Sequence, residues 1–247
     1  MNDPTQEEHR ARIELAAAYR VAARLRFTDH LATHFSVRVP GPDEHFLINP
    51  YGLTFDEVRA SNLVKVDVGG EVVDDPTGLG INRAGFVIHS ALHRARPDVH
   101  CVLHTHTAAG IGVAAQEDGL LMASQHAMLF HGHLAYHEYE GVATDLDEQQ
   151  RLVRDLGAND AMILRNHGLL TCGPTVAHAF TLLYYLERAC AAQIAAQSGG
   201  ARLHTVPPAV AEKVGAVRDS ARWPDLAQRN WDAFVREQDR VDASYKA

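Results

Sequence analysis

The sequence predicts one mixed α/β domain in which short strands and hairpins alternate with helices. Strands are indicated by short runs of β-branched and aromatic residues between turn residues, and helices by longer runs with apolar residues at helical spacing. No internal repeat or low-complexity linker divides the chain. Its 247 residues suit one large domain, or one domain with an appendage.

The first half of the chain is expected to contain two helices and five strands. Ile13, Leu15 and Tyr19 recur at roughly helical spacing, which indicates an amphipathic helix at the start. Gly69-Gly70 marks a hairpin turn, and Pro97 ends the second helix. The predicted helices span 7–26 and 82–97, and the predicted strands span 34–39, 45–50, 63–68, 71–74 and 99–104.

The second half is expected to be mainly helical around one further buried strand, which lies within residues 161–173. Asp145 is the candidate N-cap of a helix that Gly157 ends, and Gly199-Gly200 end a long apolar helix. The predicted helices span 107–119, 145–157 and 175–200, and more helices are expected in the charged tail from 201 to 247.

Composition excludes several classes of function. The net charge of −8 offers no basic surface for nucleic acid or anionic membrane. No apolar run approaches the roughly 20 residues that span a bilayer. The N-terminus lacks a secretory signal and the three cysteines form no CxxC pair, so we expect a reduced, cytoplasmic protein. Sixteen histidines against 23 lysines and arginines are a weak pointer to metal or proton chemistry.

Nucleotide-binding motifs are incomplete. The run GLGINRAGF at 78–86 lacks the Lys-Ser/Thr pair of a phosphate loop. GIGVAA at 110–115 follows a predicted strand, but no acidic residue lies about 20 positions further on to hold a ribose. Packing of small residues is the better interpretation of that run.

Two histidines stand at the end of a buried strand. In CVLHTHTAAG (101–110), His104 and His106 are two positions apart, so in a strand both point to one face, roughly 6.5–7 Å apart at Cα. They can bind one ion, and a polar strand end wetted by solvent is the alternative. AMILRNHGLL places His167 in the same way after apolar residues. Three nitrogen ligands with an open position are typical of a catalytic metal site.

Five stretches in this order resemble the class II aldolase and adducin head-domain family: HFSVRV, FLINPYGLTFDEV, NRAGFVIHSALHRARPDVHCVLHTHT, LRNHGLLTCG and LLYYLERA. The resemblance covers roughly residues 10–200. It implies a three-layer αβα sandwich with a central, mostly antiparallel sheet in residues 1–205. A helical tail at 206–247 is expected to pack on the body or on a neighbouring subunit. By the same motifs, His104, His106 and His167 are expected to hold a divalent metal, with zinc first and manganese or iron as alternatives.

The chain departs from the sugar-phosphate aldolases of this family in two respects. Their catalytic glutamate lies four residues before a helix histidine, and here that place is Gly85, with His89 expected to pack or cap the helix. Their phosphate-binding places read here Thr33-His34, Tyr51-Gly52 and Arg83-Ala84. Only the glycine is retained, so a phosphorylated sugar is not expected.

The same positions suggest how an unphosphorylated substrate is bound. Arg83 offers a planar donor fork to a carboxylate, and His34 and Tyr51, beside Gly52, offer further hydrogen bonds. A surface salt bridge for Arg83 and turn packing for the others are the alternatives.

The NRAGF version of the helix resembles the adducin-like branch of the family, which contains metal-dependent decarboxylases and the non-catalytic heads of adducins. Decarboxylation forms its carbanion by loss of CO₂ and needs an acid only afterwards, so it tolerates the missing glutamate. Retro-aldol cleavage needs a base for a hydroxyl proton. A metal-bound hydroxide or a histidine could supply that base.

The resemblance also implies subunit contacts. Aldolases of this family use a tyrosine of the adjacent subunit as proton donor, and an approximate alignment puts His126 at that place. His131, His133 and Tyr139 are rivals, and a surface or interface role is the alternative. A homo-oligomer, by resemblance a tetramer with sites between subunits, is therefore expected.

These observations favour a divalent-metal-dependent carbon–carbon lyase. It would be an aldolase-type aldehyde-lyase or a decarboxylase, acting on a small unphosphorylated hydroxy or oxo carboxylate. An adducin-like binding module without catalysis and a non-haem iron oxygenase on the same scaffold are the alternatives. No nucleic-acid or membrane partner is expected.

Overall fold

The computed structural model describes residues 4–41, 44–141, 146–200 and 202–247, and one eight-stranded sheet forms its centre. The strands are β1 (His34–Arg38), β2 (His45–Ile48), β3 (Val64–Asp67), β4 (Val72–Asp74), β5 (Cys101–Thr105), β6 (Ala135–His137), β7 (Ala161–Leu164) and β8 (Gly168–Gly173). Their order is β4-β3-β2-β1-β5-β8-β7-β6. All neighbours are antiparallel except β6 and β7, so the expected mostly antiparallel sheet is confirmed.

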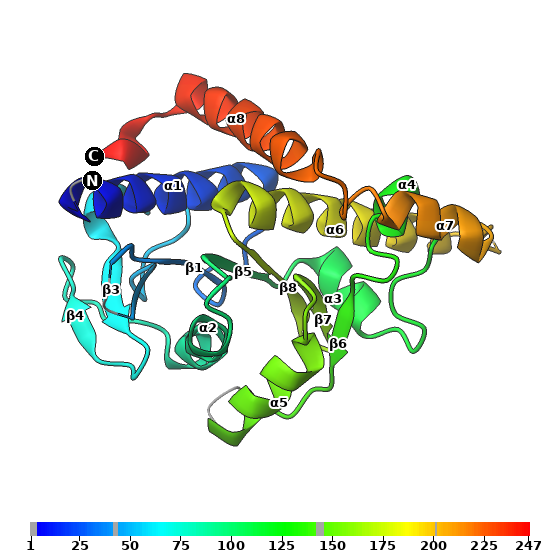
Figure 1. Ribbon diagram of the computed structural model, residues 1–247, viewed down its shortest axis with the longest axis horizontal. Coiled ribbons are helices and arrows are strands. Elements are labelled where there is room, and N and C mark those ends of the chain that lie inside the picture. The colour runs from blue at the N-terminus through cyan, green and yellow to red at the C-terminus, as the bar shows by residue number, and fades with distance from the viewer. Residues whose placement is uncertain (1–3, 42–43, 142–145, 201) are drawn as a thin grey trace.

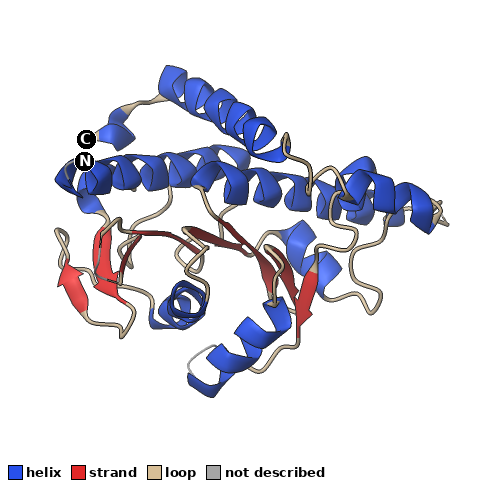
Figure 2. Ribbon diagram, viewed as in Figure 1, coloured by secondary structure: helices blue, strands red, loops and turns tan. Residues whose placement is uncertain are grey.

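Helices cover both faces of this sheet (Figure 1 and Figure 2). They are α1 (Pro4–Leu25), α2 (Arg83–Ala95), α3 (Ala108–Ala114), α4 (Gln125–Met128), α5 (Leu146–Leu156), α6 (Val176–Gln197), α7 (Pro208–Gly215) and α8 (Trp223–Val241), with short 3-10 helices η1 (Ala60–Asn62) and η2 (Ser244–Lys246). Helices α1, α3 and α6 pack on one face, and α2 and α5 on the other. The predicted three-layer αβα sandwich is confirmed.

On the face of the sheet that α1 and α6 cover, helix α6 is itself covered on both sides. Helix α6 is apolar nearly all round, because the sheet lies below it and α8 lies above it (Figure 1). Such a helix is expected only in the interior. The side chain of Thr175 caps its N-terminus by accepting a hydrogen bond from the backbone N–H of His178.

Most predicted elements are present within one to four residues of their expected bounds, and the prediction for 161–173 was incomplete. That stretch is two strands, β7 and β8, joined by a tight turn. Asn166 makes the turn with φ 55°, in the left-handed region that asparagine tolerates. The small-residue helix also stops at Ala114, earlier than expected. The predicted N-cap Asp145 lies outside the described residues.

The register of the strands brings four histidines to one end of the sheet. His34 at the start of β1 pairs with His104 near the end of β5. His167 lies in the turn between β7 and β8, and β8 runs back beside β5 with Leu169 opposite Thr105. His137 ends β6 and pairs with Leu164, the last residue of β7. Positions far apart in the sequence therefore share one small region.

The C-terminal segment contacts the body of the same chain. Helix α8 packs on α1 and α6. Between α7 and α8, Arg218 forms an ion pair with Asp160, and the indole N–H of Trp223 donates to Nδ1 of His178 over 3.2 Å. A division of the chain near residue 205 remains a prediction.

None of the helices in the described ranges is long and apolar enough to cross a membrane.

The side chain of Tyr19 connects α1 to the paired strands β1 and β2. Its buried hydroxyl accepts hydrogen bonds from the backbone N–H groups of Phe35 (2.7 Å) and Asn49 (3.2 Å). We expect Tyr19→Phe to lower the free energy of unfolding by about 1–3 kcal/mol, since buried N–H donors would lose their acceptor. Denaturant unfolding measures this change. Tyr184→Phe is the control, because no hydrogen bond of its hydroxyl is found among the described residues, and an equal effect of both variants would contradict this account.

Candidate metal centre

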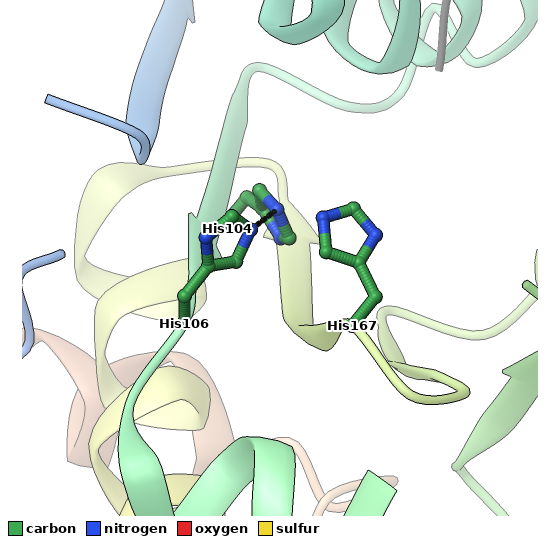
Figure 3. A group of neighbouring side chains, drawn as sticks. All are labelled: His104, His106 and His167. Atoms are coloured by element: carbon green, nitrogen blue, oxygen red, sulfur yellow. Dashed lines mark hydrogen bonds between the residues drawn. The ribbon is translucent and has the colours of Figure 1, made fainter. Parts of the chain in front are cut away.

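Three histidine rings converge at the end of β5 and in the β7–β8 turn (Figure 3). Each of His104, His106 and His167 offers one nitrogen to a common point, and these three nitrogens lie within 4.8 Å of one another. Nε2 of His104 is 2.8 Å from Nε2 of His106. The strand spacing that predicted the His104–His106 pair is therefore found, and the third ring joins it from the neighbouring turn.

The outer nitrogens of two of these rings are fixed by acceptors. Nδ1 of His104 is 2.9 Å from the carbonyl oxygen of Leu169, and Nδ1 of His106 is 3.0 Å from a carboxylate oxygen of Asp29. A carbonyl and an ionised carboxylate only accept hydrogen bonds, so both Nδ1 atoms must carry protons. In the neutral rings, both Nε2 atoms then bear lone pairs.

Two lone pairs facing each other across 2.8 Å repel unless a proton or a cation lies between them. Neutral imidazole nitrogens with outer N–H groups donated to a carbonyl and a carboxylate are the arrangement seen at protein metal sites. The residues present therefore fit a divalent ion, and three nitrogen ligands leave further coordination positions for substrate.

Burial favours the neutral form of two of these rings, His104 and His167. It lowers the pKa of His104 well below the ordinary histidine value, and the neighbouring rings lower it further. Burial also lowers the pKa of His167 to about 4, with His106 and His137 adding to the effect. A neutral ring does not have to lose a proton before it binds a metal, so protons compete weakly for His104 and His167 near pH 7.

Glu187 of α6 holds the segment that carries the first two histidines. Its carboxylate accepts hydrogen bonds from the hydroxyls of Thr105 and Thr107, each with an oxygen–oxygen distance of 2.5 Å. These threonines alternate with His104 and His106 along the chain. Burial raises the pKa of Glu187, and the two hydroxyls oppose that shift. The threonine anchors fix the backbone from which the two histidine rings project.

Gly168 allows the turn with His167 to approach β5. A β-carbon at this position would overlap the carbonyl oxygen of Thr105 and lie 3.0 Å from Cδ2 of His106. Any larger residue would therefore push the third ring away from the other two. This close approach explains why glycine follows His167.

His34 fills the space beside Gly85. A β-carbon at Gly85 would lie 2.5 Å from Nε2 of His34 and closer still to its Cδ2. The His34 ring also packs on His104, with ring centres 5.2 Å apart. The space beside Gly85, where the chain lacks a carboxylate, is thus filled by the imidazole of His34 from β1.

A chain of buried polar groups holds that imidazole in place. Nδ1 of His34 is 2.8 Å from Nε2 of His89, and Nδ1 of His89 is 2.5 Å from the hydroxyl of Ser36. The same hydroxyl is 2.7 Å from Nε2 of His93. Burial lowers the pKa of all three histidines, to about 3 for His93. His89, expected to pack or cap its helix, is a hydrogen-bonded core residue that orients His34.

The other predicted substrate-binding residues lie at the same end of the sheet. Arg83 is exposed and begins α2, two residues before Gly85. Tyr51 is exposed just after the end of β2, and Gly52 adopts φ 122°, which favours glycine. Contacts of these side chains with the three-histidine cluster are not found among the described residues, and their binding roles remain predictions.

His126 is not part of the three-histidine cluster. It belongs to α4, and its ring stacks on Tyr185 of α6 with centres 5.4 Å apart. Figure 1 shows α4 beside α7, toward the far end of α6 from α1. Its expected role concerns the site of a neighbouring subunit, which one chain does not test, so that role remains a prediction.

Two residues that fix the site were missed by sequence reasoning. Asp29 sits in a polar loop and carries no motif that links it to His106. Glu187 had a usable signal, because it is the one carboxylate in the mostly apolar stretch LLYYLERA. A buried carboxylate on such a helix face requires partners, which the threonines of HTHT supply.

The comparisons with known proteins agree on one family. Residues 13–194 match the sequence profile described as class II aldolase and adducin N-terminal domain. A protein of Pseudomonas aeruginosa named as an aldolase class 2 protein is 46% identical over 244 residues, covering 97% of this chain and 93% of its own. Rat alpha-adducin is 44% identical over 193 residues, which is 76% of this chain and 26% of the adducin.

Solved structures give the same result. An aldolase II superfamily protein from Pseudomonas syringae has a TM-score of 0.94 at 57% identity, covering 98% of this chain and 96% of its own. The L-fuculose 1-phosphate aldolase from Glaciozyma antarctica has a TM-score of 0.88 at 26% identity, covering 100% and 96%. The likeness extends over the whole chain, including the C-terminal helices.

The tight fit of His34 against Gly85 gives a test of this site. In the wild type, Gly85→Ala should lower the free energy of unfolding by about 1–3 kcal/mol, because the new methyl group overlaps a ring that His89 holds. In a His34→Ala background the same change should be neutral or stabilising by about 0.5–1 kcal/mol, since alanine is the better helix former. Denaturant unfolding of the four proteins measures the coupling. An equal effect of Gly85→Ala in both backgrounds would show that the two residues do not compete for space.

Proposed function

The chain belongs to the class II aldolase and adducin N-terminal domain family, and on that premise we propose that it is a divalent-metal-dependent carbon–carbon lyase. Its substrate would be a small unphosphorylated hydroxy or oxo carboxylate. The observation that carries this proposal is the pair of Nε2 atoms on His104 and His106, whose lone pairs face each other across 2.8 Å. Their outer nitrogens carry protons, so the facing lone pairs need a proton or a cation between them, and a divalent ion would fill that place.

His104, His106 and His167 would hold the ion, with zinc first and manganese or iron as alternatives. A divalent ion bound there supplies Lewis acidity to a carbonyl or carboxylate oxygen of the substrate. Leu169 and Asp29 keep the first two rings in the orientation that binding requires. Because these orientations exist before substrate arrives, they need not be formed during the reaction.

The absence of a carboxylate at position 85 supports chemistry that does not begin with abstraction of a C–H proton. Loss of CO₂ leaves its electron pair on carbon directly, whereas retro-aldol cleavage removes only a hydroxyl proton. Both carboxy-lyase and aldehyde-lyase activity therefore fit the residues. His34 would contribute an uncharged imidazole nitrogen as a hydrogen-bond partner for substrate, since burial keeps its pKa low.

The residues at the sheet end support an unphosphorylated carboxylate as substrate. The L-fuculose 1-phosphate aldolase relative acts, by its name, on a phosphorylated sugar. In this chain the corresponding places carry His34, Tyr51 and Arg83, of which Arg83 suits a carboxylate through its planar donor fork. We further propose that the protein is a homo-oligomer in which His126 donates a proton at the site of a neighbouring subunit. A cytoplasmic location completes the proposal.

An adducin-like binding module without catalysis is the second candidate. The 44% identity with alpha-adducin favours it. The two candidates differ at the metal site, because a binding module has no need for three converging nitrogen ligands, two of which have their outer N–H groups held by acceptors.

Metal analysis combined with a substrate screen tests the proposal. We expect purified protein to contain stoichiometric zinc, manganese or iron and to release CO₂ or an aldehyde from a member of a panel of aromatic and aliphatic hydroxy, oxo and dicarboxylic acids. His104→Ala and the milder His106→Asn should lose the metal and at least a hundredfold of the rate, because the metal carries the charge stabilisation. His100→Ala is the matched control, since His100 lies just before β5 at the other end of that strand.

Several outcomes would contradict this proposal. Protein without stoichiometric metal would favour the binding module. Iron content with substrate-dependent consumption of O₂ would favour an oxygenase. Equal rates for the wild type and both cluster variants on every active compound would exclude the three histidines from the chemistry.

A further inference from the structure

The third histidine of the cluster lacks the support that the other two have. Leu169 and Asp29 accept hydrogen bonds from His104 and His106, but no partner for either ring nitrogen of His167 is found among the described residues. In Figure 3 one nitrogen of His167 faces His104 and the other points away from both rings. Metal-binding histidines almost always donate this outer N–H to an acceptor. An acceptor is therefore required on the far side of His167.

A second buried histidine, His137, also has a ring nitrogen without a hydrogen-bond partner. His137, at the end of β6, is 4% exposed, and its Nδ1 is 2.7 Å from a carboxylate oxygen of Asp155. Its Nε2 is buried without a hydrogen-bond partner. The nearest carboxylate oxygen, of Glu148, is 3.8 Å away, which is too long for a direct hydrogen bond. Where polar groups lie more than about 3.5 Å apart, a water molecule can connect them.

Both histidines line one small cavity. His137, His167 and Glu148 line it, together with Tyr139 and apolar residues of α2, α5 and β7. Its volume is about 10 Å³, at the lower limit for one water molecule. The two histidines lie close together because β6 and β7 are parallel neighbours: His137 pairs with Leu164, and His167 follows three residues later in the β7–β8 turn. The site is thus polar, enclosed and of the right size for a single water.

We propose that one ordered water in this cavity bridges the outer ring nitrogen of His167 to Nε2 of His137, and that His137 and Asp155 are positioning residues for the third metal ligand. This inference rests on the proposed metal-binding role of the three-histidine cluster and extends it to residues that no motif identifies.

The hydrogen-bond directions in this arrangement are mutually consistent. Asp155 accepts from Nδ1 of His137, so Nε2 of the neutral ring is an acceptor. The water then donates one hydrogen to Nε2 of His137 and the other to the carboxylate of Glu148. Its oxygen accepts the outer N–H of His167. All three polar groups are satisfied, and the inner nitrogen of His167 keeps its lone pair for the metal.

The expected consequence is a rigid third ligand. Asp155 fixes the His137 ring, the water transmits that orientation to His167, and the ring of His167 cannot rotate without breaking a buried hydrogen bond. Removing an outer partner of this kind typically weakens metal affinity by about 10- to 100-fold.

The test is Zn²⁺ affinity at pH 7, measured by competition with a chromogenic chelator. His137→Leu should bind Zn²⁺ about 10- to 100-fold more weakly than the wild type. His137→Gln, whose amide oxygen can accept the same hydrogen bond, should restore most of the affinity. His178→Leu is the matched control. It removes another His–Asp pair, with Asp160 at 2.7 Å, at the opposite end of β7, and should leave Zn²⁺ affinity unchanged.

The outcomes separate this inference from the proposed function. Wild-type protein that fails to bind Zn²⁺, Mn²⁺ or Fe²⁺ would overturn the metal centre itself. Wild-type binding with unchanged affinity in folded His137→Leu would overturn the bridge and leave the centre standing. Equal losses in the Leu and Gln variants would also overturn it, because a hydrogen-bond acceptor would then not be what matters. If His137→Leu does not fold, Asp155→Ala takes its place, with a several-fold loss expected and an unchanged affinity contradicting the inference.

Discussion

The candidate site depends on two hydrogen bonds that fix where protons lie on neighbouring histidines. The carbonyl of Leu169 and the carboxylate of Asp29 hold protons on the outer nitrogens of His104 and His106. In the neutral rings the inner nitrogens are then bare and face each other, an arrangement that is unfavourable unless a proton or a cation lies between them. The fold therefore favours a positive charge at this point, and burial of His104 favours a metal ion there by lowering the pKa of that ring.

The rest of the structure brings these groups to one place and sets the distances between them. Antiparallel pairing of β1, β5 and β8 and parallel pairing of β6 and β7 collect His34, His104, His137 and His167 at one end of the sheet. Glu187 anchors the segment between the ligands from α6, and Gly168 lets the β7–β8 turn come close. On the side of α2, Gly85 leaves room for the ring of His34. Position 85, to which the family resemblance assigns the glutamate of the sugar-phosphate aldolases, thus faces a volume that the imidazole of His34 fills.

Sequence reasoning predicted those parts of the site that obey local rules. The period of two in a strand identified His104 and His106, and the apolar run before His167 identified the third ring, although that run proved to be a hairpin. The αβα fold class followed from a family resemblance carried by contiguous motifs. Asp29, Glu187 and His137 were not predicted as site residues, because the groups on which they are found or proposed to act lie at least 30 positions away and no periodicity marks such a contact. Contacts between distant elements depend on the register of the sheet, which one sequence does not reveal.

A crystal structure of the protein soaked with Zn²⁺, with anomalous diffraction recorded on both sides of the zinc edge, tests the central claim most directly. The account predicts one strong anomalous peak per chain, about 2.0–2.1 Å from one nitrogen of each of His104, His106 and His167. The hydrogen bonds to Leu169 and Asp29 should remain in place. A peak at another group of residues, or no peak while His104 and His106 keep their present contact, would contradict it.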